Sequence, residues 1–219
     1  HYAWAGVRMQ KGGDCVAVFR GNPIVPPRQN KPPFWRHNFL HNQILFSAFH
    51  MSSQNLSSYV SELRRCAPKI LDGYPSTLYI LAKYLQNVEQ KLPLQAVVSS
   101  SETLYDFQRE IIEDRFDCKV FDYFAAAERV AFSSECNHHE GHHIADEYGI
   151  TEIIDASGKS APHGMEGMLV ATSLHNYAMP LIRYVTNDMS AIKTDACSCG
   201  RGLSMMADVT TKAEDFLTL

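Results

Sequence analysis

One stretch decides the fold class: LQAVVSSSE at residues 94–102, a short apolar run that ends in small polar residues. On either side of it, apolar residues recur three and four positions apart, which is typical of amphipathic helices. We expect one helix from its N-cap Ser76 to about Val88, and another that starts at Ser101 or Thr103. This later helix would turn inward the apolar residues Leu104, Phe107, Ile111 and Phe116.

The same alternation continues outward from this stretch. Residues 15–20 and 118–124 predict strands, and residues 56–66 predict a helix. Helices that alternate with short apolar strands indicate a parallel sheet with crossover helices, a Rossmann-like α/β fold. Ligands of such sheets bind at the carboxyl ends of the strands. The loops at 99–102 and 124–128 follow two of the strands and are therefore candidate binding loops.

The two ends of the chain show other patterns. Prolines interrupt the region before residue 55, which we expect to be a strand followed by a long loop. After about residue 140, short strands without helices predict a small barrel-like or curled β-sheet. The sequence thus predicts three segments: an irregular part at 1–55 that completes the core, a parallel-sheet part at 56–135 and a β part at 136–219.

The composition is that of a globular protein, with 45% hydrophobic and 20% charged residues in 219. This length corresponds to one large domain or two small ones. The net charge of −4, from 20 basic and 24 acidic residues, gives no electrostatic case for a nucleic-acid partner. No apolar stretch approaches the ~18 residues of a membrane span. We expect a cytoplasmic protein that has no membrane span and no nucleic-acid partner.

Three of the six cysteines are grouped with histidines. Cys136 precedes histidines at 138, 139, 142 and 143, and the segment Cys197-Ser198-Cys199 supplies two thiolates from one short turn. Zinc prefers four such ligands in a tetrahedron, and two separated ligand pairs are a common arrangement of structural sites. We expect a structural zinc held by these cysteines and one of the histidines. The alternative interpretation is a reduced thiol pair beside a His-rich loop.

Two acidic residues are candidate ligands of a nucleotide. Asp188 follows the strand predicted to end at Thr186, and a carboxylate at a strand exit can accept two hydrogen bonds from a ribose diol. Glu128 follows three alanines and is a candidate ligand of Mg²⁺. Taken alone, the first pattern is more typical of a turn cap, and the second of a helix start.

The order of these pieces resembles the phenylacetate–CoA ligase family of adenylate-forming enzymes. The resemblance rests on five segments in register: GYPS at 73–76, SSSE at 99–102, FAAAERV at 124–130, RYVTND at 183–188 and CSCGR at 197–201. It is strongest toward the capsule-biosynthesis branch of the family, in which PFWR (33–36) and ERV (128–130) also occur. The match runs across nearly the whole chain.

This resemblance implies that a carboxylic acid attacks the α-phosphate of ATP, giving acyl-AMP and pyrophosphate, after which a thiol such as coenzyme A takes the acyl group. It implies ATP, Mg²⁺ and a structural Zn²⁺ as cofactors. Ser101 and Glu102 would lie beside adenine, Asp188 would bind the ribose hydroxyls, and Glu128 would hold Mg²⁺. Lys212 matches the hinge about which a small C-terminal domain of the family swings.

The resemblance also indicates which of the cysteines and histidines would bind the metal. The zinc of the family would be bound here by Cys136, His143, Cys197 and Cys199, because His143 follows Gly141 at the family's Gly-X-His spacing. Three positions near the nucleotide depart from the family pattern, with Phe124 in place of Tyr, and Ala125 and Asn187 in place of Gly. These departures bear on nucleotide affinity more than on the fold, since Asn tolerates the left-handed conformation.

The substrate implied is an aromatic or other small carboxylic acid, with Tyr74, Phe121, Tyr123, Phe124 and Ala125 lining its pocket by their position in the loops. The acceptor would be coenzyme A, with an amine or a sugar as alternatives, and a homodimer follows from the resemblance only. The family's phosphate loop would lie before residue 1, and its C-terminal domain after residue 219. We therefore expect these 219 residues to be an internal fragment that is inactive in adenylation by itself.

Two other functions compete with the ligase. The departures at Phe124, Ala125 and Asn187 fit a non-catalytic, zinc-stabilised relative that acts as a scaffold or binding module in surface-polysaccharide biosynthesis. A zinc hydrolase built on the His cluster is disfavoured, because the sequence places no carboxylate to act as a base beside an open metal position.

Overall fold

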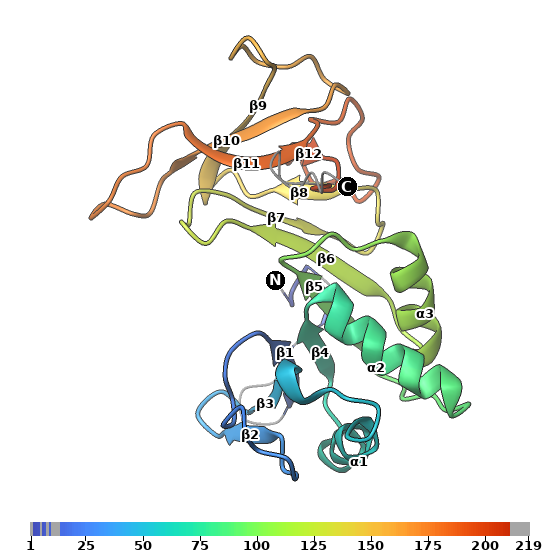
Figure 1. Cartoon of the computed structure of the whole chain (residues 1–219). Helices are drawn as coiled ribbons and strands as arrows, with labels where there is room; N and C mark the ends of the chain where they lie inside the picture. The colour runs from blue at the N-terminus through green and yellow to red at the C-terminus, as the bar shows by residue number, and fades with distance from the viewer. Residues whose placement is uncertain (1, 5, 8, 10–13, 211–219) are drawn as a thin grey trace, which may run out of the picture. The chain divides into compact units, whose positions relative to one another are not determined.

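The computed structural model describes residues 2–4, 6, 7, 9 and 14–210 (Figure 1). They form two compact units, one of residues 2–121 and one from Asp122 onward, so that the division falls within strand β6 (Val120–Ala125). The predicted functional segments 1–55, 56–135 and 136–219 stay a prediction. Among the described residues, none of the helices has the length and apolar character that crossing a membrane requires.

The unit of residues 2–121 is built on a mostly parallel sheet with the strand order β5-β4-β1-β3-β2. β1 pairs in parallel with β3 and with β4, and β4 pairs in parallel with β5, whereas β2 pairs antiparallel with β3. The predicted parallel sheet is thus confirmed. The strands are β1 (Val16–Arg20), β2 (Trp35–Asn38), β3 (Gln43–Ser47), β4 (Ile70–Gly73) and β5 (Ala96–Ser100).

Three strands of this sheet were not predicted. β2 and β3 lie in the proline-rich region expected to be a long loop, and a short 3-10 helix (Ala48–His50) follows β3. Phe46 of β3 is nevertheless buried against α1: it stacks on Phe19 of β1 with ring centroids 4.6 Å apart, and both rings contact Tyr59. β4 escaped prediction because its four residues run directly into the turn before the next helix.

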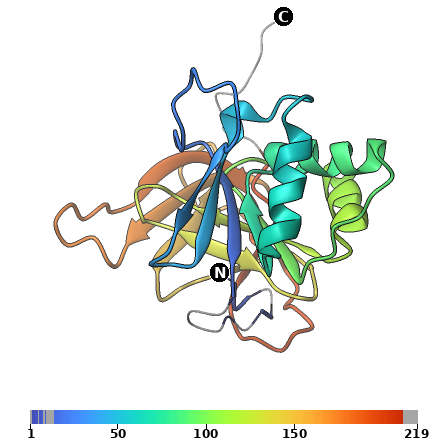
Figure 2. The same cartoon turned by 90° about the horizontal axis from the view of Figure 1, so that it is seen from below.

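Three helices accompany these strands, α1 (Leu56–Cys66), α2 (Pro75–Asn87) and α3 (Asp106–Phe116). α2 and α3 lie side by side in both views (Figures 1 and 2). The predicted bounds of α1 are confirmed, and Ala67 ends it in the left-handed conformation before Pro68. α2 starts two residues earlier than expected, with Tyr74 rather than Ser76 as N-cap, because proline suits the first helical position, where its missing N–H costs nothing.

The predicted inner face of α3 is partly wrong. Phe107 is 53% exposed, whereas Ile112 and Phe116 are fully buried and Gln108 lies beside them. The helix begins at Asp106 rather than at Ser101 or Thr103, with Tyr105 and Gln108 forming a capping box. The spacing of four between the buried residues defines the inner face, and Phe107 instead packs edge-on against Tyr79 of α2.

The unit from Asp122 onward is antiparallel. In one group of strands, β7 pairs with β6 and with β8, and β8 pairs with β12. The barrel-like arrangement expected here is replaced by this group and a separate three-stranded sheet of order β11-β10-β9. The strands are β7 (Phe132–Glu135), β8 (His142–Ile144), β9 (Gly149–Ile154), β10 (Gly167–Ser173), β11 (Tyr184–Ser190) and β12 (Met205–Met206).

Candidate functional site

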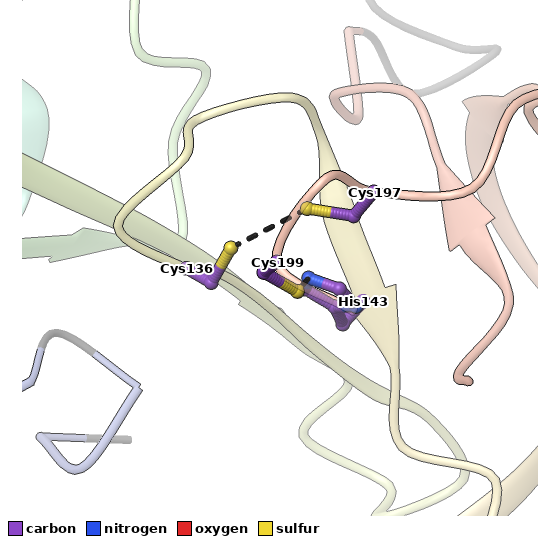
Figure 3. Close-up of side chains that lie close together, drawn as sticks. All are labelled: Cys136, His143, Cys197 and Cys199. Carbon is purple, nitrogen blue, oxygen red and sulfur yellow. Dashed lines mark hydrogen bonds between the residues drawn. The ribbon is translucent and has the colours of Figure 1, made fainter. Parts of the chain in front are cut away.

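Four metal-ligating side chains converge in the second unit: Cys136, His143, Cys197 and Cys199 (Figure 3). The Sγ atoms of Cys136 and Cys197 lie 3.6 Å apart, and Sγ of Cys199 lies 3.5 Å from Nε2 of His143. The four ligand atoms all lie within 4.8 Å of one another. Bonds of ~2.3 Å to sulfur and ~2.0 Å to nitrogen place tetrahedral zinc ligands about 3.5–3.8 Å apart. The donor set and its spacing therefore fit a structural zinc ion.

The pairing of β7 and β8 explains why His143 is the histidine in this cluster. Ser134 of β7 pairs with His143 of β8. Side chains alternate between the two faces of a strand, so Cys136, two residues beyond Ser134, lies on the same face as His143. His142 points to the opposite face. This register places His143, and not His142, on the face of the cysteine cluster.

The turn that carries Cys197 and Cys199 is held by Glu140. Oε2 of Glu140 accepts the backbone N–H of Ser198 at 2.8 Å, and Oε1 accepts its hydroxyl at 2.7 Å. These bonds lower the pKa of Glu140 to about 2, so the carboxylate stays charged. Gly141 follows with a φ of +122°, and a Cβ there would lie 2.8 Å from the carbonyl oxygen of Met206. Only glycine therefore fits between Glu140 and β8.

The pKa shifts of Cys199 and His143 favour the forms that a metal requires, whereas the shift of Cys197 opposes it. A hydrogen bond from the backbone N–H of Arg201 lowers the pKa of Cys199 to about 7, whereas burial raises the pKa of Cys197 to about 12. Burial lowers the pKa of His143, which favours the neutral imidazole that a metal requires. Metal binding would thus displace a proton from Cys197.

Glu128, the candidate Mg²⁺ ligand, lies in the turn that joins β6 to β7 and not at a helix start. The turn is closed by the N–H of Arg129, which donates to the carbonyl of Ala126 at 3.0 Å. Oε1 of Glu128 accepts a hydrogen bond of 3.0 Å from the Tyr184 hydroxyl of β11. The structure therefore links the FAAAERV segment to the RYVTND segment.

Asp188 lies inside β11 rather than at the strand exit predicted for it. The four steps of β11 from Val185 to Met189 face only two steps of β10, from Met168 to Val170, which makes a bulge. Asn187 takes a φ of +63° in this bulge, as expected for an asparagine that replaces glycine. The Thr186 hydroxyl donates to the carbonyl of Leu169 and accepts the N–H of Asp188. The bulge is therefore fixed by its own side chains.

Glu102 of the first unit contacts the start of α2. Its two carboxylate oxygens accept the backbone N–H and the hydroxyl of Ser76, both at 3.0 Å. Ser101, just beyond β5, has a φ of +71° and is exposed like Glu102. The SSSE and GYPS segments thus meet at the carboxyl end of the parallel sheet, as the sequence predicted for binding loops.

The remaining predicted residues are placed as follows. Tyr74 is the half-buried N-cap of α2, while Phe121 and Tyr123 are buried side chains on one face of β6. Phe124 is half-buried and Ala125 is exposed at the end of the same strand. Lys212 and the hinge segment lie outside the described residues.

Sequence reasoning missed the supporting roles of Tyr184, Glu140 and Ser198. Tyr184 belongs to the RYVTND segment, but nothing in the sequence indicates a role of its own. Glu140 lies between the histidines, and its sequence context indicates no role either. Their contacts span 56 and 58 residues of sequence, so no local spacing reveals them.

Two known proteins are similar in sequence to most of this chain. The chain is 32% identical to Protein CapK of Staphylococcus aureus over 190 residues, which cover 84% of this chain and 40% of that protein. It is 28% identical over 159 residues to the phenylacetate-coenzyme A ligase of Thermus thermophilus, covering 69% of this chain and 36% of the ligase. These matches confirm the resemblance to the phenylacetate–CoA ligase family. The chain spans less than half of the length of either relative.

The fold agrees with adenylate-forming CoA ligases. The structure of 2-hydroxyisobutyryl-CoA ligase in complex with 2-HIB-AMP and CoA, in the thioesterification state, matches 96% of this chain and 45% of that ligase. The TM-score is 0.72 at 19% identity, which shows a shared fold. No protein-family model matches the chain. The mixed α/β fold with its mostly parallel sheet is therefore that of the adenylate-forming CoA ligases.

Proposed function

We propose that this chain carries the adenine and ribose side of the active site of an ATP-dependent acid–CoA ligase. A carboxylate oxygen of the acid attacks the α-phosphorus of ATP, and the bond to pyrophosphate breaks to leave acyl-AMP. The thiol of coenzyme A then attacks the acyl carbon, loses its proton and releases AMP. The similarity to phenylacetate-coenzyme A ligases supports both steps, and their names support an aromatic acid as the substrate class.

The contact between Tyr184 and Glu128 carries this proposal. It joins two of the five family-like segments through a hydrogen bond of 3.0 Å, which supports the proposal that they belong to one site. Glu128 offers one carboxylate, which together with phosphate oxygens is the ligand set that Mg²⁺ prefers in nucleotide sites. Bound there, Mg²⁺ would neutralise charge on the phosphates. Asp188, fixed by the bulge of β11, would accept the hydrogen bonds of the ribose hydroxyls.

Zinc has a structural role in this proposal. Cys136, His143, Cys197 and Cys199 supply four protein ligands, which leaves no open position for a substrate or a water. The ion would fix the turn at residues 197–199 to β7 and β8. This arrangement argues against a zinc hydrolase.

A pyrophosphate-exchange assay tests the ligase. The protein encoded by the complete reading frame around residues 1–219 is incubated with ATP, labelled pyrophosphate and each of a panel of aromatic and short aliphatic acids. We expect exchange that depends on the acid and that falls about 10²-fold in Glu128→Gln. Glu147→Gln is the matched control, because Glu147 is an exposed acid on the loop after β8. Exchange at background with every acid would contradict the proposal.

A non-catalytic scaffold is the second candidate, favoured by Phe124 and Ala125 in place of Tyr and Gly. The Asn187 departure no longer supports it, because Asn187 adopts the positive φ that the family's glycine would take. A protein that binds zinc but shows neither nucleotide binding nor exchange would favour this candidate over the ligase.

A further inference from the structure

The strands that carry the cysteine cluster present a second group of ligating side chains on their opposite face. Glu135 of β7 pairs directly with His142 of β8, which in turn pairs with Met206 of β12. Asp208 follows two residues after Met206, and Asp122 lies beside Glu135 on β6, where its backbone N–H donates to Oε2 of Glu135 at 2.7 Å. An acid–acid–histidine–acid row therefore crosses the group of antiparallel strands.

The atoms of this row are spaced for a shared cation. Nε2 of His142 lies 3.4 Å from Oδ1 of Asp208 and 3.7 Å from Oδ2 of Asp122. One ligand atom from each of Glu135, His142 and Asp208 lies within 4.8 Å of the others. The separations exceed the ~2.9 Å of a good N–H···O hydrogen bond. They are close to the ~3.0–3.6 Å between neighbouring ligands that each lie ~2.1 Å from one metal ion.

His142 supplies the independent observation that points to a ligand. Its side chain is 1% exposed, and its Nε2 makes no hydrogen bond within the described part of the chain. The other ring nitrogen, Nδ1, lies 3.3 Å from the hydroxyl of Ser133, which orients the ring. When Nδ1 carries the proton, the lone pair of Nε2 faces the carboxylates of Asp122 and Asp208. A cation between them satisfies all three groups at once.

We propose that Glu135, His142 and Asp208, with Asp122 beside them, form a second metal site that binds a divalent transition-metal ion of the Mn²⁺ or Fe²⁺ type. One imidazole nitrogen among carboxylate oxygens suits these ions better than Mg²⁺ or Ca²⁺, which favour oxygen alone. The site differs in kind from the thiolate cluster on the other face, which selects zinc. It does not depend on the proposed ligase activity.

The test uses Mn²⁺ as the probe on the 219-residue chain first loaded with one equivalent of Zn²⁺ to fill the cysteine cluster. Electron paramagnetic resonance measures free Mn²⁺ during a titration. We expect one saturable Mn²⁺ site whose affinity falls at least 10-fold in Asp208→Asn. Asp208 is 63% exposed, so this change is compatible with folding. Asp146→Asn, at another exposed acid, should bind Mn²⁺ like the wild type, and the zinc content should stay the same in both variants.

Spin-echo spectroscopy of bound Mn²⁺ gives a readout that needs no variant. Ligation by His142 predicts a coupling to ¹⁴N in the wild-type protein. Absence of a saturable Mn²⁺ site would overturn the proposal and leave an ion pair between protonated His142 and its carboxylates. The proposal would also be overturned by equal Mn²⁺ affinity in wild type and Asp208→Asn, or by bound Mn²⁺ without nitrogen coupling.

Discussion

The hydroxyl of Tyr184 donates a hydrogen bond of 3.0 Å to Oε1 of Glu128. It connects β11 to the turn between β6 and β7, two segments that are 56 residues apart in the sequence. The bond and the negative charge of Glu128 raise the pKa of Tyr184 above its ordinary value of 10. The phenol therefore stays neutral and keeps the carboxylate of Glu128 in one orientation.

Glu128→Gln should lower the pKa of Tyr184 toward 10. The neutral amide still accepts a hydrogen bond, but it no longer opposes the negative charge of the phenolate. NMR titration of ¹³C-labelled tyrosines measures the shift. The resonance of Tyr177, which is 90% exposed, is the internal control and should not respond to the substitution. An unchanged Tyr184 titration would show that the contact with Glu128 does not form in solution.

Cys199→Ser should reduce the zinc content of the purified protein from about one ion per chain to well below half. The serine hydroxyl is a poor zinc ligand, and three remaining ligands bind structural zinc weakly. Metal content by mass spectrometry is the measurement. Cys118→Ser is the matched control, because Cys118 lies outside the cluster and should leave zinc in place. Equal zinc in both variants would count against the four-ligand assignment.

Glu140→Ala should weaken zinc binding about 10-fold without removing any ligand. The change releases the two hydrogen bonds to Ser198 that fix the turn between Cys197 and Cys199. Competition with a chromophoric chelator gives the affinity. Glu147→Ala, at an acid after β8, should bind zinc like the wild type. If both variants hold zinc equally well, Glu140 does not position the turn.

Glu102→Ala should lower the free energy of unfolding by about 1 kcal/mol, the usual effect of losing a side-chain acceptor at a helix N-terminus. Glu102 accepts the N–H of Ser76, the first backbone donor of α2, because Pro75 has none. Urea denaturation provides the measurement, with Glu110→Ala on the exposed face of α3 as control. Equal destabilisation by the two changes would contradict the role of Glu102 at the N-terminus of α2.

The helices and strands that have a clear local apolar pattern could be predicted from the sequence. The apolar spacing of α1 and α2 and the apolar runs of β1, β5 and β6 led to the parallel sheet, and Pro68 marked the end of α1. The face of α3 was misjudged because Phe107 and Ile112 both fit a helical stripe, and only packing decides between them. β3 was missed because Phe46 is buried against Phe19 and Tyr59, which are distant in sequence, and β2 because only its pairing with β3 defines it.

The candidate site likewise contains residues that the local sequence reveals and residues that only strand pairing brings together. The Cys/His ligands were predictable, because their residue types and local pairs are a chemical signature. The spacing alone left four histidines open, and the pairing of Ser134 with His143 decides between the two on β8, because it puts His143 on the cysteine face and His142 on the other. The row of Glu135, His142 and Asp208 could not be predicted, since it exists only through strand register.

Binding of a non-hydrolysable acyl-AMP analogue, measured by calorimetry on the 219-residue chain, tests most directly whether the chain carries the nucleotide side of a ligase site. We predict binding of one analogue per chain, weakened about 10-fold by Asp188→Asn, which removes the charged acceptor for the ribose hydroxyls. Asp146→Asn should bind like the wild type. No measurable binding, or equal binding by Asp188→Asn and the wild type, would contradict this assignment.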